Sequence, residues 1–188
     1  NARLFEDSIY RERWASALAE TARRLMQDED DEHLGFLVDR VKELADADLV
    51  CIGLVTPHRD FLVIDRAAGT GAVELTAMSF SLDDSIAGQA IHGGEPVVVP
   101  DAGVLDDHDF TAQKKLGNAM VIPFNLGEGN SGVLGLARLR GRPDFDTRAL
   151  DLGTSFASHH SVAIPRAAAR MAPRPIAPPQ NRHRSARD

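Results

Sequence analysis

The sequence predicts an α+β fold in which a central antiparallel β-sheet is flanked by helices. Short apolar or alternating segments, separated by turn residues, fill the middle of the chain, and segments with helical periodicity lie toward its two ends. Strands joined by short turns pair as antiparallel neighbours. The expected order of elements is α-α-β-β-β-α-β-loop-β-β-α, with the N- and C-terminal helices packed together.

Three longer helices are expected. The first runs from Ser8 to about Gln27, because it lacks Gly and Pro and is rich in good helix formers. Its apolar residues form a narrow seam, typical of a helix that packs against a partner helix: Trp14, Leu18, Thr21 and Leu25. Glu32–Ala45 has a wider apolar face, typical of a helix lying on a sheet. The last helix follows a capping Asp146 and runs from Thr147 to about Ile164.

Between these helices, apolar runs bounded by turn residues predict six strands. They are Leu49–Val55, Phe61–Ile64, Met78–Leu82, Val97–Val99, Ala119–Phe124 and Gly132–Leu139. A short helix, Ile86–His92, begins after the capping residues Asp83–Ser85 and ends at Gly93–Gly94. Residues 101–118 are expected to form a long loop with at most one helical turn, and loops of that length are often binding elements.

Composition limits the classes of function. The 188 residues suit one domain with appendages, and the formal net charge of −7 argues against a nucleic-acid-binding protein. No apolar run approaches the roughly 18–20 residues that cross a bilayer. No signal-peptide core follows Asn1, so we expect a cytoplasmic protein, or a part of one, without a membrane partner.

The chain divides into three expected parts. We expect residues 1–28 to form an N-terminal dimerisation helix, residues 29–164 to form the main domain, and residues 165–188 to form a linker. From Pro165 to Asp188 the chain holds six Arg, one Asp and five of the ten prolines, a composition that cannot bury enough apolar area to fold. A basic tail that touches nucleic acid or acidic lipid is the alternative interpretation of this segment.

Catalytic signatures are absent from the sequence. There is no GxSxG elbow, HExxH motif or P-loop, and the single Cys51 excludes an internal disulfide or a CxxC pair. The glycines of residues 127–132 join two strands, so they do not form a dinucleotide fingerprint. We interpret Asp106–Asp109 as a solvated acidic loop and Cys51 as an inert buried thiol, and leave a pH-sensitive contact open for His159–His160. We expect no enzyme and no metal site.

A pocket is the remaining candidate site. The short helix, the long loop and the strand Ala119–Phe124 are expected to lie together on one face of the sheet, where they would enclose a concave apolar site. The candidate lining residues are Ile86, Ala90, Val98, Asp101, Met120, Ile122 and Phe124. The alternative is a pocket filled by the domain's own side chains.

The order of several motifs resembles that of a GAF domain, the small-molecule-sensing module of signalling proteins. The motifs are Leu82–Ala90, Gly94–Asp101, Ala119–Phe124, Ser131–Leu136 and Pro143–Asp146, and the resemblance covers about residues 30–164. The chain is also similar to the second GAF domain of actinobacterial sensor histidine kinases of the dormancy-sensor type. Asn181–Asp188 is similar to the stretch that leads into the phosphoacceptor helix of that kinase class.

The resemblance implies a GAF/PAS-like fold and a regulatory or sensory role in a two-component system. The domain would bind a small molecule, or relay a signal, and act on a kinase domain of the same chain through its terminal helices. The phosphoacceptor histidine of such kinases is not in this sequence, so no kinase activity is expected of it. A homodimer is implied, with candidate contacts at Trp14, Leu18, Leu25 and Phe156. The alternative is a ligand-free structural relay that transmits strain from a neighbouring sensor domain.

The departures from the family concern its cofactors. Haem-binding members carry a proximal histidine in a region that reads Thr111–Leu116 here and has none, so haem is not expected. Bilin-binding members use a cysteine in the pocket region, whereas Cys51 lies in a different element, so a bilin is not expected either. One cysteine also excludes the GAF-type methionine sulfoxide reductase chemistry. The sequence leaves the ligand unidentified.

Overall fold

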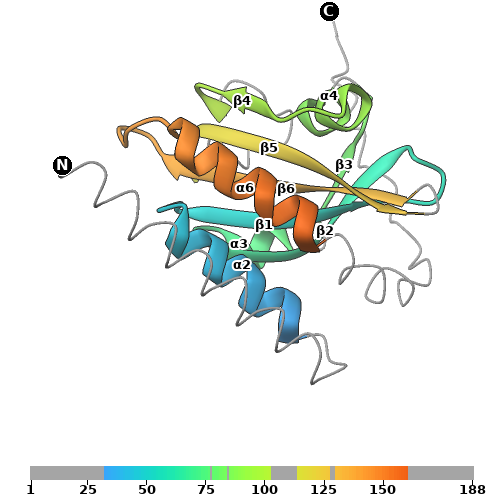
Figure 1. Ribbon diagram of the computed structural model, residues 1–188, viewed down its shortest axis with the longest axis horizontal. Helices are drawn as coiled ribbons and strands as arrows, with labels where there is room; N and C mark the ends of the chain where they lie inside the picture. The colour runs from blue at the N-terminus through green and yellow to red at the C-terminus, as the bar shows by residue number, and fades with distance from the viewer. Residues whose placement is uncertain (1–31, 77, 84, 103–113, 128–129, 161–188) are drawn as a thin grey trace, which may run out of the picture.

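The computed structural model describes residues 32–76, 78–83, 85–102, 114–127 and 130–160 of the chain. They form a six-stranded sheet in the order β3-β2-β1-β6-β5-β4, in which every neighbouring pair is antiparallel (Figure 1). The strands are β1 (Leu49–Val55), β2 (Phe61–Gly69), β3 (Ser79–Ser81), β4 (Val97–Val99), β5 (Leu116–Gly127) and β6 (Asn130–Leu139). The predicted α+β class is confirmed.

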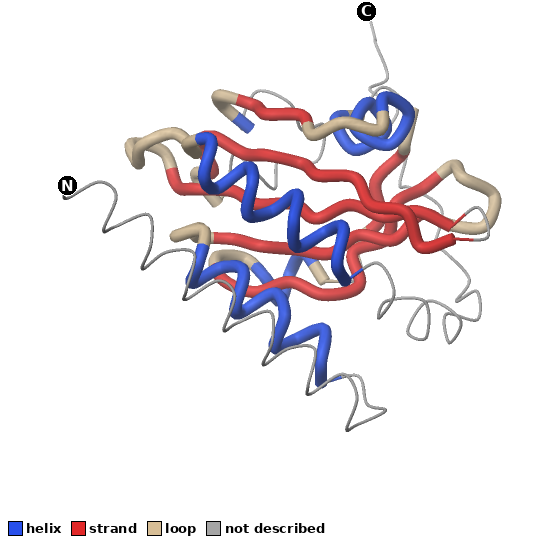
Figure 2. The backbone as a smooth tube through the Cα atoms, viewed as in Figure 1, coloured by secondary structure: helices blue, strands red, loops and turns tan. Residues whose placement is uncertain are grey.

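Four helices of the described ranges cover the two faces of this sheet (Figure 2). On one face, α2 (Glu32–Leu44) contacts β1 and β2, and α6 (Thr147–His160) contacts β5 and β6. The other face carries α3 (Ala72–Leu75) beside β1 and β2, and α4 (Ile86–Gly93) beside β4, β5 and β6. Within the described ranges, no helix combines the length and the apolar character needed to cross a bilayer. The sheet therefore separates two long helices from two short ones.

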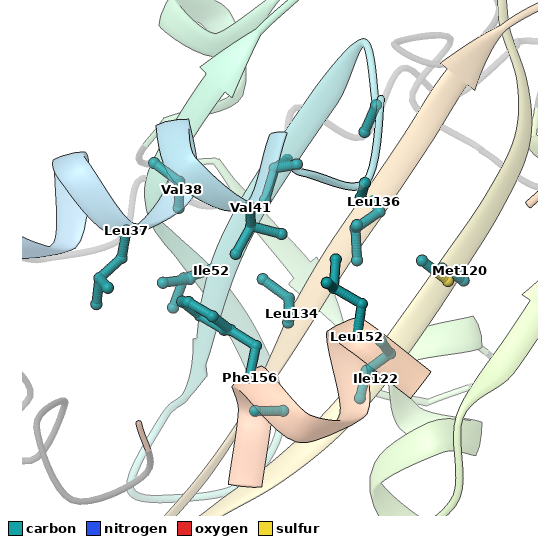
Figure 3. Close-up of a cluster of buried hydrophobic side chains, with 14 of the residues drawn as sticks. Leu37, Val38, Val41, Ile52, Met120, Ile122, Leu134, Leu136, Leu152 and Phe156 are labelled. Carbon is teal, nitrogen blue, oxygen red and sulfur yellow. The ribbon is translucent and has the colours of Figure 1, made fainter. Parts of the chain in front are cut away.

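The face under α2 and α6 holds the larger apolar core, which we call the helix-side core (Figure 3). Its buried residues come from α2, β1, β2, β5, β6, α6 and the α2–β1 turn: Leu37, Val38, Val41, Ala45, Ala47, Val50, Ile52, Leu54, Ala68, Met120, Ile122, Phe124, Leu134, Leu136, Ala149, Leu152, Phe156 and Ala157. The side chains recur every three or four residues along the helices and every second residue along the strands, as those geometries require. This core is the main apolar contribution to stability in the described domain.

The opposite face holds a second cluster, which we call the α4-side core. Its buried residues are Leu49, Leu62, Ile64, Leu75, Leu82, Ala102, Leu116, Val133 and Ala137. They are contributed partly by the sheet and partly by α3 and the segments that flank α4 and β4. Because successive side chains of a strand point to opposite faces, β1, β5 and β6 take part in both cores.

The six strands and the helices around residues 32–45, 86–92 and 147–160 occur where the sequence predicts them. Three features differ. The helix α3 was not predicted, β2 continues five residues beyond the expected Ile64, and β5 begins at Leu116 inside the expected long loop. The predicted helix Ser8–Gln27 lies outside the described residues.

Pro123 shows how β5 accommodates a residue without a backbone N–H. It pairs with Val133 of β6 on one side, whereas β4 pairs with β5 only from Ala119 to Val121. Among the described strands, the side of β5 that faces away from β6 therefore has no partner at Pro123. A proline is tolerated in a strand at such an edge position because no ladder hydrogen bond is lost.

Candidate functional site

Helix α4 is fixed at both of its ends. The Ser85 hydroxyl oxygen accepts a hydrogen bond from the Gly88 amide (3.0 Å), which caps the start of the helix, and it donates to the Leu82 carbonyl (3.2 Å). The helix ends at Gly93, and the capping residue Gly94, with a left-handed φ of 67°, donates its amide to the carbonyl of Ala90. These caps hold α4 against the sheet, where Ala87 and Ile91 pack on the α4-side core and Ala90 is fully buried.

Gly88 is required for this position of α4. An ideal Cβ at Gly88 would lie 1.9 Å from the carbonyl oxygen of Leu82. Any larger side chain would therefore push the first turn of α4 away from the segment that precedes it. Within Leu82–Ala90, the backbone of Gly88 therefore lies in close contact with the Leu82 carbonyl, at the edge of the α4-side core.

Side chains of small to medium size from β1 and β5 pack on the α4-side core. Among them are Val121 and Ala119 of β5 and Cys51 of β1, and Gly135 of β6 lies beside Cys51. A Cβ at Gly135 would lie 2.8 Å from the Cys51 sulfur, so the glycine makes room for the thiol. Burial raises the pKa of this thiol from 9.0 to about 12. The sulfur is therefore a neutral, apolar part of this surface, although the residue as a whole is half-buried rather than fully buried as the sequence predicts.

The raised pKa of Cys51 predicts slow alkylation. At pH 8 it reduces the thiolate population about a thousandfold relative to an ordinary cysteine, and the thiolate is the reactive form. We expect iodoacetamide to modify the native protein far more slowly than the protein in urea. Because the pKa is higher in the folded state, the associated stability is present below pH 9 and is lost as the pH rises toward 12. Equal alkylation rates in the native and unfolded protein would contradict the burial of this thiol.

Charged pairs lie around the α4-side core. Arg140, after β6, donates to the carboxylate of Asp101 (3.2 Å), and Lys114, before β5, pairs with Glu74 of α3. The hydrogen bond from Lys114 lowers the pKa of the Glu74 carboxyl. Both pairs are exposed enough for solvent to weaken them, so they orient the segments rather than stabilise the fold strongly.

The structure divides the predicted pocket residues between the two faces. Ala90 and the half-buried Ile86 lie on α4, Val98 of β4 is 51% exposed, and Asp101 forms the ion pair described above. Met120, Ile122 and Phe124 instead lie in the helix-side core, under α6. The reason is the two-residue period of β5: Ala119 and Val121 point to the α4 side, so their neighbours point away from it.

Of the predicted dimer contacts, only Phe156 lies within the described residues. Phe156 of α6 is 4% exposed and points toward Ile52 within the helix-side core (Figure 3), so it is a core residue and offers no surface to a partner. This corrects the assignment of Phe156 as a dimer contact. Trp14, Leu18 and Leu25 lie outside the described residues, as does the acidic cluster Asp106–Asp109. Among the described residues, no group of three His, Cys, Asp or Glu side chains could hold a metal ion.

A buried arginine at one end of the sheet was not singled out from the sequence. Arg138 of β6 is 9% exposed and donates four hydrogen bonds to backbone carbonyls. Its Nε donates to Asp46 (3.0 Å) and its Nη2 to Ala45 (3.0 Å), at the end of α2. Its Nη1 donates to Pro143 (2.9 Å) and Asp144 (3.2 Å), just before α6. We call Arg138 and these four carbonyls the Arg138 junction; the sequence signal for it is a lone arginine in the apolar run Gly132–Leu139.

Neighbouring groups reinforce the Arg138 junction. The ring of Phe145 stacks on the guanidinium at 4.4 Å, and the Asn118 side-chain amide donates to the Pro143 carbonyl (3.3 Å). Arg142 donates to the carboxylates of Asp46 and Asp48 (3.0 Å to Asp48), and these contacts raise the pKa of its guanidinium. The Asp48 carboxylate also accepts a hydrogen bond from the backbone amide of Leu139 (2.8 Å). This bond holds the start of β1 beside the end of β6.

Solved structures provide a comparison for this architecture. The GAF-B domain of DevS from Mycobacterium smegmatis is 25% identical, with a TM-score of 0.59 over 72% of this chain and 92% of that chain. The GAF domain of a two-component sensor histidine kinase from Bacillus halodurans is 17% identical, with a TM-score of 0.62 over 74% and 95% of the two chains. The GAF domain of a phosphoenolpyruvate-protein phosphotransferase from Coxiella burnetii is 15% identical, with a TM-score of 0.69 over 84% and 96%.

The last two likenesses show the fold alone. Comparison with curated protein sequences gives no match. A family profile described as the GAF domain matches residues 28–164, which is most of the sequence. The chain therefore belongs to the GAF domain family, and its fold is the α+β GAF fold.

Proposed function

We propose that this regulatory GAF domain serves a two-component sensor histidine kinase and couples the α4 side of its sheet to the helices that lead out of the domain. The observation that carries the proposal is that a single sheet separates the two cores. The α4-side core and the helix-side core share β1, β5 and β6, with alternate residues facing each side. A molecule or a strain that displaces a strand on one face therefore acts directly on the other face.

The contact between β5 and α6 supports this coupling. Val121 faces the α4 side, and its neighbour Ile122 faces α6. Gly153 lies at the middle of α6 and approaches Ile122 so closely that a Cβ at Gly153 would be 2.3 Å from the Ile122 Cδ1 atom. Because close-packed groups transmit displacement rather than absorb it, a shift of β5 moves α6.

Two features support the proposed sensor-kinase parent and the proposed homodimer. The 25% identity to the second GAF domain of DevS from Mycobacterium smegmatis supports the motif resemblance seen in the sequence. The seam of Trp14, Leu18 and Leu25 in the sequence supports a homodimer, which the N-terminal helix predicted from the sequence would form. A ligand would bias such a dimer only through different affinities for its two helix arrangements.

A small molecule on the α4 side is the first candidate input. Among the described residues, ten partly buried apolar residues surround nine buried ones in the α4-side core, compared with four around eighteen in the helix-side core. The α4 side thus leaves more apolar surface for a ligand to cover. The second candidate is a ligand-free relay, and it is favoured by the leucines that fill the centre of the same core, each no more than 4% exposed: Leu49, Leu62, Leu75, Leu82 and Leu116.

Native mass spectrometry of the gently purified protein, with an absorption spectrum of the same sample, tests the proposal. We expect a dimer of twice 20.4 kDa that carries an additional small-molecule mass. Gly88→Ala, which displaces α4, is expected to lose that mass, and Gly93→Ala in the same helix is expected to keep it. A bare dimer would favour the ligand-free relay, and a bare monomer would contradict both the ligand and the dimer.

A further inference from the structure

The turn that follows α2 contains a strained backbone conformation. Asp46 lies just beyond Leu44, the last residue of the helix, and has a left-handed φ of 50°. This conformation costs free energy for a residue with a Cβ atom, and glycine is the usual residue where a helix ends in this way. Such strain persists where the surrounding groups hold the backbone in place.

Two arginines that follow one another closely in the chain hold Asp46. The Nε atom of Arg138 donates to the Asp46 carbonyl (3.0 Å), and Arg142 donates to the Asp46 carboxylate. The Nη2 atom of Arg138 donates to the carbonyl of the preceding residue, Ala45 (3.0 Å). Because the guanidinium is planar and its donors have fixed directions, both carbonyls stay bonded while the turn keeps this conformation. A change of the backbone at Asp46 would turn a carbonyl away from its donor.

The same guanidinium also contacts the segment that leads into α6. Its Nη1 atom donates to the carbonyls of Pro143 (2.9 Å) and Asp144 (3.2 Å). The side-chain amide of Asn118, from β5, donates to the Pro143 carbonyl as well (3.3 Å). Movement of the residues before α6 would therefore displace the group that holds Asp46.

We propose that Asp46 is a conformational switch at the end of α2, which Arg138 keeps in the left-handed state and which is released when the segment before α6 moves. In the released state Asp46 adopts an ordinary backbone conformation, and the turn between α2 and β1 opens. One side chain thus couples the end of α2 to the start of α6, through an element with two discrete arrangements. The device operates whether or not a ligand binds on the α4 side.

Hydrogen exchange measured by mass spectrometry tests the coupling, with the peptide of residues 40–48 compared with the peptide of β2. Asn118→Leu removes a hydrogen bond on the α6 side of the junction. We expect it to raise the ratio of the two exchange rates about fivefold, the effect of one lost hydrogen bond. Because a general loss of stability accelerates both peptides, an unchanged ratio would overturn the proposal.

Glycine at position 46 distinguishes a switch from a simple loss of contacts. Arg138→Met is expected to raise the same ratio about tenfold. Asp46→Gly removes the cost of left-handed backbone, so adding it to Arg138→Met is expected to bring the ratio back to within about twofold of the parent. Asp46→Ala is the matched control, because it loses the same carboxylate but keeps a Cβ atom, and it is expected to give no rescue.

The rescue experiment has one outcome that contradicts the switch. If Asp46→Gly and Asp46→Ala left the exchange of Arg138→Met equally fast, the strain at this residue would have no role and the proposal would be overturned. Arg138→Lys cannot form the same fork of hydrogen bonds, so it replaces Arg138→Met in all three combinations should the methionine variant not fold.

Discussion

Replacing Arg138 by methionine is expected to lower the free energy of unfolding by about 3 kcal/mol. Methionine matches the length of the arginine stem but donates no hydrogen bond. The carbonyls of Ala45, Asp46, Pro143 and Asp144 would each lose a charge-assisted donor, and the stacking contact with Phe145 would be lost as well. Urea denaturation followed by far-UV circular dichroism measures the change.

Two variants make this result specific. Arg140→Met removes an arginine of the same strand end whose side chain is 50% exposed and makes one ion pair, so a change within about 0.5 kcal/mol is expected. Arg138→Lys is expected to recover only part of the loss, because one ammonium cannot reach four carbonyls in two directions. If Arg138→Met and Arg140→Met were equally stable, the junction would not contribute to the stability of the fold.

Replacing Gly88 by alanine is expected to destabilise the domain by about 2 kcal/mol and to loosen α4 first. The added methyl group would meet the carbonyl oxygen of Leu82 at 1.9 Å, and a backbone atom cannot move aside as a flexible side chain does. The first turn of α4 must shift, which weakens the Ser85 cap and the packing of Ile91. Hydrogen exchange measured by mass spectrometry on the peptide that spans α4 reports the local effect.

Gly93 gives the control within the same helix. Nothing lies within 4 Å of a Cβ at Gly93, and its φ is not in the left-handed region. Alanine there is expected to stabilise the protein by up to about 1 kcal/mol, because alanine has the higher helix propensity. Faster exchange of α4 in Gly93→Ala than in Gly88→Ala would be incompatible with the close contact at Leu82.

Most of the fold can be predicted because each strand carries a local signal. The apolar run Leu49–Val55 and the turn residues around it identify β1 without reference to the rest of the chain. Helix α3 has no comparable signal: four residues are too few for a periodic pattern, and its start depends on left-handed backbone at Gly69 and Gly71. The start of β5 was equally hidden, because an irregularity between Leu116 and Ala119 interrupts its pairing with β6.

The candidate site could be predicted less well. Both faces of β5 carry apolar residues, so the sequence does not determine whether Val121 or Ile122 points toward α4. The packing of α6 on one face of the sheet determines it. The Arg138 junction depends on carbonyls almost a hundred residues away along the chain, such as those of Ala45 and Asp46. Backbone acceptors have no residue type to recognise, so a lone arginine in an apolar strand was the only sign of it.

The positions of the start of α2 and the end of α6 have a consequence for how such domains are combined with others in one protein. Because α2 begins and α6 ends at the same end of the sheet (Figure 1), the described domain is entered and left from one side. Chain segments whose ends lie close together can be inserted, exchanged or duplicated with little disturbance to their neighbours. The same architecture can therefore be transferred as one cassette between proteins that have different output domains.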